Sequence, residues 1–279
     1  MLEVAVNSGD QLGECALWDP RSGLVWWLDI LRPALQSYDP RTRQHRVYPL
    51  PGRNCGCAFL RASGGFILAM DTGLHAFELA TGLGDLLCRP ETGMPENRYN
   101  DGRCDRAGRL WIGTMHLSTE KPTGSFYSVA PDFTVERHLE DLKVPNSTAF
   151  SPDGGTLYFT DTPRHVIWAF DLDIKAGVIA NRRVFADVSD RGAYPDGSCI
   201  DAEGFLWNCE YAGRRLTRYA PDGRVDRVVE VPVENPTCCC FGGENLDTLY
   251  ITSAAGSKPG SLLALDPGVR GLPEAMFAS

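Results

Sequence analysis

Short apolar strands separated by Gly, Pro and Asp turns run through the whole chain. One pattern, a turn followed by an aromatic or apolar strand, appears six times along the sequence. Its copies begin at Asp19, Ala62, Asp105, Pro152, Asp201 and Gly242. They lie roughly 40–50 residues apart, which is the repeat length of β-propeller blades.

A second apolar strand follows each copy of the turn, and no long segment has the period of an amphipathic helix. These strands lie at 35–39, 74–78, 125–129, 166–171, 215–219 and 261–266. Further strands close several repeats, as at 183–186 and 227–231. Because one blade cannot cover both of its own faces, the blades must pack on one another around an axis. The pattern predicts an all-β fold, a six-bladed β-propeller with four-stranded antiparallel blades, in a single domain over residues 1–279. We expect Val4-Ala5-Val6 to pair into the last blade and close the ring.

Polar residues recur at one position of the repeat, near the start of the first strand and just before each turn. The occupants around the ring are Glu14, Gly56, Asn100, Asn146, Asp196 and Thr237. The alignments that give Gly56 and Thr237 could slip by one residue, whereas the other four are firm. Since the first strand of a propeller blade lines the central channel, these four oxygen-bearing side chains are expected to converge near one mouth. Asp, Asn and Gly are also common turn residues, but Glu14 has little value in a turn. Because these residues share one radial position, a functional site is favoured over a purely structural role in turns.

Two of these residues, Glu14 and Asp196, carry like charges, and bringing them together is costly unless a cation lies between them. Carboxylate and amide oxygens are the ligands that Ca²⁺, Mg²⁺ and Mn²⁺ prefer. The ring contains no His, and a Cys only if the second alignment slips to Cys55, so a zinc site of nitrogen and sulfur ligands is less natural. Zinc also accepts carboxylates, which leaves the identity of the metal open.

The composition narrows the class of protein. A net charge of −9 over 279 residues argues against a nucleic-acid partner, which needs a basic face. No apolar run is long enough to span a membrane, and the N-terminus does not resemble a secretory signal. We therefore expect a cytoplasmic protein, with a monomer favoured. In a reducing compartment, the ten cysteines are expected to be free thiols. Neither Cys55-Gly56-Cys57 nor 238–240 has the spacing of a zinc site.

Several short motifs together resemble those of the gluconolactonase/regucalcin-like (SMP-30) sugar lactonase family, and the resemblance covers nearly the whole chain. They lie at 13–14, 18–19, 98–102, 113–115, 145–146, 151–154, 195–197 and 241–243. The resemblance implies a six-bladed propeller with one divalent metal cation, which could be Ca, Zn, Mn, Mg or Fe(II). It implies Glu14, Asn146 and Asp196 as metal ligands, and Arg98 and Asn100 as the residues that bind a small-molecule sugar lactone.

The chain departs from the family pattern at three places. Cys15-Ala16 follow Glu14 where the family usually has Gly-Pro, and Ser147 follows Asn146 where the family usually has Gly. The segment 116–120 does not align clearly with the part of some relatives that holds a substrate-contacting acid. These differences bear on the shape of the pocket and leave the three implied ligands in place.

Lactone hydrolysis requires a polarised carbonyl and an activated water, and a metal with open positions serves both. Asp196 is the candidate catalytic residue, as general base or as the group that orients the water. Arg98 and Asn100 would hydrogen-bond the sugar hydroxyls. His116 either faces the mouth of the site or lies in solvent, with the surface position favoured, whereas Glu210 and Tyr211 either line the pocket or lie at an edge.

Two alternatives stay open. The same propeller and metal would also serve an esterase or phosphotriesterase. The second alternative is a non-catalytic propeller that binds calcium or a protein partner, although such a scaffold has no need of Glu14 at the axis. No Gly-x-Ser-x-Gly motif is present, which argues against a serine hydrolase.

Overall fold

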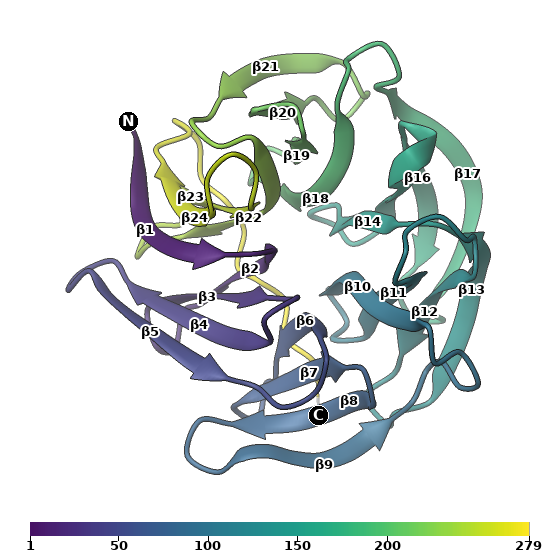
Figure 1. The fold of residues 1–279 in the computed structure, drawn as a ribbon. Coiled ribbons are helices and arrows are strands. Elements are labelled where there is room, and N and C mark those ends of the chain that lie inside the picture. Colours follow the sequence, from purple (N-terminus) through teal and green to yellow (C-terminus); the bar gives the residue numbers. More distant parts are fainter. Residues whose placement is uncertain (279) are drawn as a thin grey trace.

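The computed structural model describes residues 1–278, and these fold into six four-stranded antiparallel sheets. Figure 1 shows the sheets arranged as the blades of a ring around six innermost strands. The predicted six-bladed propeller is confirmed, while the assignment of residues 1–279 to one domain stays a prediction. Within the described residues, no helix is long and apolar enough to cross a membrane.

The strands follow the chain from the inside of each blade to its outside. Blade one contains β2 (Gly13–Asp19), β3 (Leu24–Asp29), β4 (Ala34–Asp39) and β5 (Gln44–Pro49), and blade two contains β6 (Cys55–Leu60), β7 (Phe66–Met70), β8 (Gly73–Glu78) and β9 (Gly82–Cys88). Blade three contains β10 (Asn97–Cys104), β11 (Leu110–His116), β12 (Gly124–Val129) and β13 (Val135–Leu142), and blade four contains β14 (Pro145–Phe150), β15 (Thr156–Asp161), β16 (Val166–Asp173) and β17 (Val178–Asp187). Blade five contains β18 (Tyr194–Ile200), β19 (Leu206–Tyr211), β20 (Arg215–Tyr219) and β21 (Val225–Glu230), and blade six contains β22 (Asn235–Gly242), β23 (Thr248–Ala254), β24 (Gly260–Leu265) and β1 (Leu2–Asp10). One short 3₁₀ turn, η1 (Thr162–Arg164), connects β15 to β16.

The N-terminal strand closes the ring. β1 is the outermost strand of the last blade and pairs antiparallel with β24, so that Val4 lies opposite Leu263 and Val6 opposite Leu262. The prediction for Val4-Ala5-Val6 is therefore confirmed. Since the first and the last strand of the chain share one sheet, opening the ring would break a full strand pairing.

The repeated turn has a physical basis that is clearest in blades three and five. Asp105 accepts hydrogen bonds from the backbone N–H groups of Ala107 and Arg109, and its other oxygen accepts one from Trp111 Nε1 at 2.9 Å. Asp201 binds Trp207 Nε1 in the same way, also at 2.9 Å. Each turn thus fixes a tryptophan that is fully buried within its blade.

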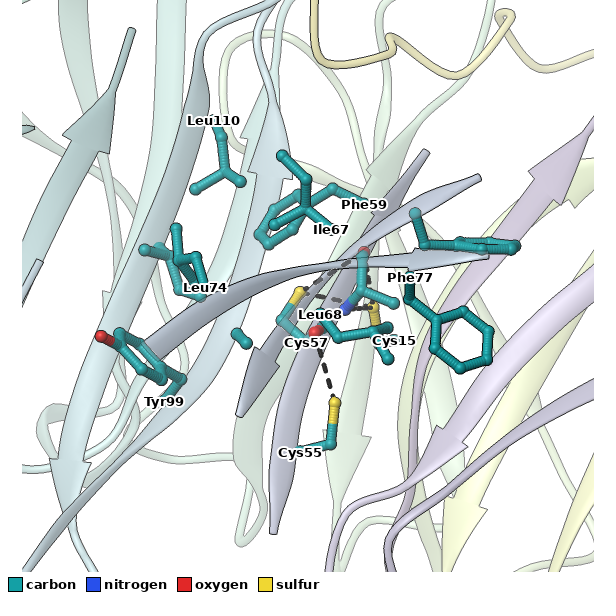
Figure 2. Close-up of a cluster of buried hydrophobic side chains, with 14 of the residues drawn as sticks. Cys15, Cys55, Cys57, Phe59, Ile67, Leu68, Leu74, Phe77, Tyr99 and Leu110 are labelled. Carbon is teal, nitrogen blue, oxygen red and sulfur yellow. Dashed lines mark hydrogen bonds between the residues drawn. The ribbon is translucent and has the colours of Figure 1, made fainter. Parts of the chain in front are cut away.

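Apolar side chains fill the spaces between neighbouring blades. β2 and β6 are buried along their whole length, and Figure 2 shows residues from β2, β6, β7, β8, β10 and β11 packed into one cluster. The Sγ atoms of Cys15 and Cys57 lie 3.3 Å apart in this cluster. All ten cysteines are free thiols in the structure, nine of them buried and Cys88 half-buried.

Candidate functional site

Each innermost strand has a break in register at the position where the repeat places its axial residue. The paired positions skip from Glu14 to Leu17, Cys55 to Cys57, Tyr99 to Gly102, Asn146 to Ala149, Pro195 to Ser198 and Pro236 to Cys239. Such bulges redirect side chains and are frequent beside active sites. Six equivalent bulges around one axis therefore turn the predicted residues toward the central channel.

The position in β6 has no side chain for a steric reason. A Cβ atom on Gly56 would lie 2.1 Å from the carbonyl oxygen of Tyr99 in β10. Arg98, the residue before Tyr99, lines an opening between the blades that these two strands begin. A cavity of about 320 Å³ opens there between blades two and three, with Arg98, Thr72, Arg89 and Glu91 among its lining residues.

A continuous chain of hydrogen bonds joins Arg98 to Asn146. Arg98 Nη1 donates to Asn100 Oδ1 at 2.7 Å, and Asn100 Nδ2 donates to Asn146 Oδ1 at 2.9 Å. The same Asn100 nitrogen also donates to the carbonyl oxygen of Pro145 at 2.9 Å. The structure thus brings together three of the sequence-derived site residues, and Asn100 holds the other two in place.

The two carboxylates, Glu14 and Asp196, are buried close enough to repel each other. Burial, followed by the charge of Asp101, raises the pKa of Glu14 to about 8. Burial also raises the pKa of Asp196 well above its ordinary value, with the charge of Glu14 as the next cause. Arg98 offsets part of this repulsion, although burial lowers the pKa of its own guanidinium to about 10.

These carboxylates have few hydrogen bonds to compensate for their burial. Cys15 N–H donates to Glu14 Oε2 at 2.9 Å, whereas Asp196 Oδ1 is buried and has no hydrogen-bond partner among the described residues. An unpartnered carboxylate oxygen beside a second buried acid and an amide oxygen fits a hard divalent cation. Across residues 1–278, no three His, Cys, Asp or Glu side chains are arranged to hold a metal. An amide such as that of Asn146 would therefore have to supply the third ligand.

Asp101 is a third acid at the axis that the sequence analysis did not select. It lies in the bulge of β10, and its Oδ2 accepts a hydrogen bond from the Thr148 backbone N–H at 2.7 Å. Burial raises its pKa, and its charge is the largest electrostatic contribution to the raised pKa of Glu14. The triplet 100–102 looks like an ordinary turn in the sequence. The only indication of its role in the sequence was that two polar residues, Asn100 and Asp101, follow each other at the ring position.

The opposite end of the channel is filled. Arg103, further along β10, donates from Nη2 to the Ser198 carbonyl oxygen in β18 at 3.1 Å and forms an ion pair with Glu274 at 2.6 Å. The C-terminal segment that carries Glu274 crosses this end of the ring, where Phe277 N–H donates to the Leu60 carbonyl oxygen at 2.8 Å. The axial cluster is therefore approached from the mouth where the innermost strands begin.

Two departures from the family pattern coincide with unusual backbone conformations. Cys15 and Ser147 have φ angles of 57° and 61°, the left-handed region that favours glycine and costs other residues about 1–2 kcal/mol each. Glycine is the usual residue of the family at both places. This chain retains the conformation and adds side chains: Cys15 Sγ contacts Cys57 Sγ, and Ser147 Oγ lies 2.6 Å from Ser198 Oγ.

The remaining candidates lie outside the axial cluster. The expectation that His116 is a surface residue is wrong, because its side chain is only 8% exposed and its Nε2 lies 3.1 Å from Glu96. Glu210 is also buried, with ion pairs to Arg191 at 2.9 Å and to Arg215 at 2.7 Å. Tyr211 is half-buried, and its pKa is raised by burial and then by Asp196.

The sequence and the fold both match known proteins. The family model described as the SMP-30/gluconolactonase/LRE-like region matches residues 12–255. A 6-deoxy-6-sulfogluconolactonase from Pseudomonas putida is 36% identical over 94% of this chain and 90% of its own length. An L-arabinolactonase from Azospirillum brasilense is 35% identical over 95% of this chain and 88% of its own. The crystal structure of a calcium-binding protein, regucalcin, from Agrobacterium tumefaciens superposes with a TM-score of 0.94 at 33% identity, covering 99% of this chain and 97% of that one.

Proposed function

Because the chain belongs to the SMP-30/gluconolactonase/LRE-like family, we propose that it hydrolyses a sugar lactone to the corresponding aldonic acid with the help of one divalent cation. The observation that carries the proposal is the axial pair of buried carboxylates, Glu14 and Asp196, beside the bonded chain from Arg98 to Asn146. Relatives named as lactonases, at 35% and 36% identity, support the reaction class.

Glu14, Asn146 and Asp196 are the residues proposed to hold the cation. When bound, the cation would supply a Lewis acid that polarises the lactone carbonyl. Asn146 suits this role because Asn100 and Thr162 engage the two ends of its amide and fix which end faces the axis. Cys15 N–H fixes one oxygen of Glu14 and leaves the other available.

Asp196 is proposed as the general base. Because Oδ1 has no hydrogen-bond partner among residues 1–278, one oxygen of the carboxylate could bind the cation while the other orients a water molecule toward the lactone carbonyl and accepts its proton. Positioned bases of this kind contribute about 10²–10⁴-fold to rates. The water oxygen would bond to the carbonyl carbon, the bond from that carbon to the ring oxygen would then break, and the proton would pass from Asp196 to the ring oxygen, which becomes a hydroxyl group of the aldonic acid.

Arg98 and Asn100 are proposed to bind the sugar hydroxyls. Within the described chain, Arg98 uses only Nη1 in hydrogen bonds, to Asn100 and to the Tyr99 carbonyl oxygen, so its other N–H groups are free to donate. Asn100 donates two hydrogen bonds through Nδ2 and accepts one from Arg98 on Oδ1, which leaves Oδ1 able to accept one more. A polar wall of this kind distinguishes a polyhydroxylated ring from an apolar ester.

A panel of substrates tests the proposal. Aldonolactones of five- and six-carbon sugars, an aryl ester and a phosphotriester would be compared by acid release or leaving-group absorbance at equal enzyme and Mn²⁺ concentration. We expect the highest kcat/KM for an aldonolactone. Faster turnover of the ester or phosphotriester would favour the esterase alternative, and no turnover of any substrate would favour a non-catalytic binding protein.

We also propose a cytoplasmic location, because ten unbridged thiols suit a reducing compartment.

A further inference from the structure

We propose that Thr162 is a positioning residue that couples two of the proposed cation ligands, a role that rests on the proposed function. Its hydroxyl lies between blades four and five. Thr162 Oγ1 accepts a hydrogen bond from Asn146 Nδ2 at 2.9 Å and donates one to the Pro195 carbonyl oxygen at 2.8 Å. One side chain therefore touches the ligand of β14 and the residue directly before the ligand of β18.

The turn that carries Thr162 is fastened to the segment that leads into Asn146. Thr162 N–H donates to the Val144 carbonyl oxygen at 2.9 Å. The preceding residue, Asp161, accepts hydrogen bonds through Oδ1 from the backbone N–H groups of Lys143 and Val144, at 3.1 and 2.8 Å. These contacts hold η1 in a fixed position relative to the start of β14.

The same turn is also fastened to the segment that leads into Asp196. The carbonyl oxygen of His165, the residue after η1, accepts a hydrogen bond from the Val188 N–H at 2.9 Å. The Nδ1 atom of His165 lies 3.1 Å from the carbonyl oxygen of Ala193. β14 and β18 are neighbours in the ring (Figure 1), and η1 bridges the connections that enter both. Thr162 is the part of this bridge that contacts Asn146 itself and the residue directly before Asp196.

The hydroxyl has a specific chemical effect on Asn146. The two ends of an Asn amide have nearly the same shape, so hydrogen-bond partners decide which end faces a ligand. By accepting from Nδ2, Thr162 directs Oδ1 toward the axis, where Asn100 also contacts it. Without the hydroxyl, the amide loses one of its two restraints and can present N–H groups to a cation. Groups that orient ligands in this way typically change metal affinity by about 10–100-fold.

Thr160 provides a matched control in the same blade. It lies opposite Asn146 in the pairing of β14 with β15, and it is fully buried. Its hydroxyl donates to the Val166 carbonyl oxygen at 2.7 Å and has no bond to either proposed ligand. Thr160→Val therefore removes a buried hydroxyl close to the site without disturbing the bridge.

The experiment measures Mn²⁺ affinity directly, by electron paramagnetic resonance titration of the chelated protein, together with the Tm of the metal-free form. We expect Thr162→Val to weaken Mn²⁺ binding by about 10–100-fold. Thr162→Ser, which keeps the hydroxyl, should stay within about threefold of the wild type. Thr160→Val should lower Tm while its Mn²⁺ affinity stays at the wild-type level.

Two results would overturn the inference while leaving the proposed function intact. Thr162→Val would bind Mn²⁺ as tightly as the wild type, or Thr160→Val would lose as much affinity as Thr162→Val. A wild-type protein that turns over a lactone but binds no Mn²⁺ would overturn the inference together with the cation part of the proposal. Lactone turnover in the wild-type sample is measured in parallel, so that the hydrolytic part is judged separately.

Discussion

Replacing Glu14 with Gln should make the metal-free protein more stable at pH 8 while weakening its response to divalent cations. Glu14 is buried beside Asp101 and Asp196, and its pKa of about 8 lies far above the ordinary 4.5. Below pH 4.5 the carboxyl is protonated in the folded and the unfolded state, so it costs no stability. As the pH rises toward 8, the unfolded state loses its proton first, and the folded state becomes progressively less favourable.

The size of the effect follows from the width of this window. Each pH unit between an ordinary pKa of 4.5 and a folded pKa of about 8 costs about 1.4 kcal/mol, which gives an upper limit of about 5 kcal/mol. Water that enters the axial channel screens the charges, so we expect about 2–4 kcal/mol. Gln is uncharged and can still accept the hydrogen bond from Cys15 N–H. The free energy of unfolding of Glu14→Gln at pH 8 should therefore exceed that of the wild type by this amount. For a chain of this size, that corresponds to a rise in Tm of roughly 5–10 °C.

Thermal unfolding of the chelated protein at pH 5 and pH 8 provides the assay. The difference in Tm between Glu14→Gln and the wild type should be small at pH 5 and large at pH 8. Adding Mn²⁺ should raise the Tm of the wild type more than that of the variant. Glu136→Gln, which removes an exposed carboxylate, is the control and should show no such difference. An equal Tm difference at both pH values would refute the electrostatic account of the axial cluster.

Three further variants test the geometry of the site, and a fourth measurement tests the cysteines. Asp196→Asn at saturating metal should lower turnover by about 10²–10⁴-fold, and a rate near that of the wild type would leave Asp196 as a ligand only. Arg98→Ala should raise KM for lactones while Mn²⁺ stays bound, and loss of the metal would place Arg98 among the ligands. Asn100→Ala should have the same effect on KM and a larger effect on Mn²⁺ affinity, because Asn100 donates to Asn146 Oδ1; unchanged kinetics would contradict its role. Thiol titration of denatured, unreduced protein should find ten free cysteines, and two or more missing thiols would indicate a disulfide.

The architecture was predictable because its signals are local and repeated. In two of the turns an Asp lies six residues before a buried tryptophan, as Asp105 does before Trp111 and Asp201 before Trp207, and the turn followed by an apolar strand recurs in the sequence as a period. The period then gives the radial position of Glu14 without knowledge of any contact. Closure of the ring by the N-terminal strand followed from the same count of strands.

The contacts across blades were not predictable in this way. Asp101 was passed over because Asn-Asp-Gly has the composition of a turn, and only the bulge in β10 turns both polar residues inward. Thr162 lies in a connecting turn, and its importance comes from the approach of β14 to β18 in space. His116 looked like a surface residue, but the pairing of β10 with β11 sets it opposite Asn97, within reach of Glu96.

Lactone turnover before and after removal of the metal tests the central claim most directly. The protein would be chelated, its metal content confirmed by elemental analysis, and aldonolactone hydrolysis measured before and after addition of Mn²⁺, Ca²⁺, Zn²⁺, Mg²⁺ or Fe²⁺. We expect hydrolysis to stop in the metal-free protein and to return to different degrees with different cations. Full lactone turnover in a sample that contains no metal would contradict it.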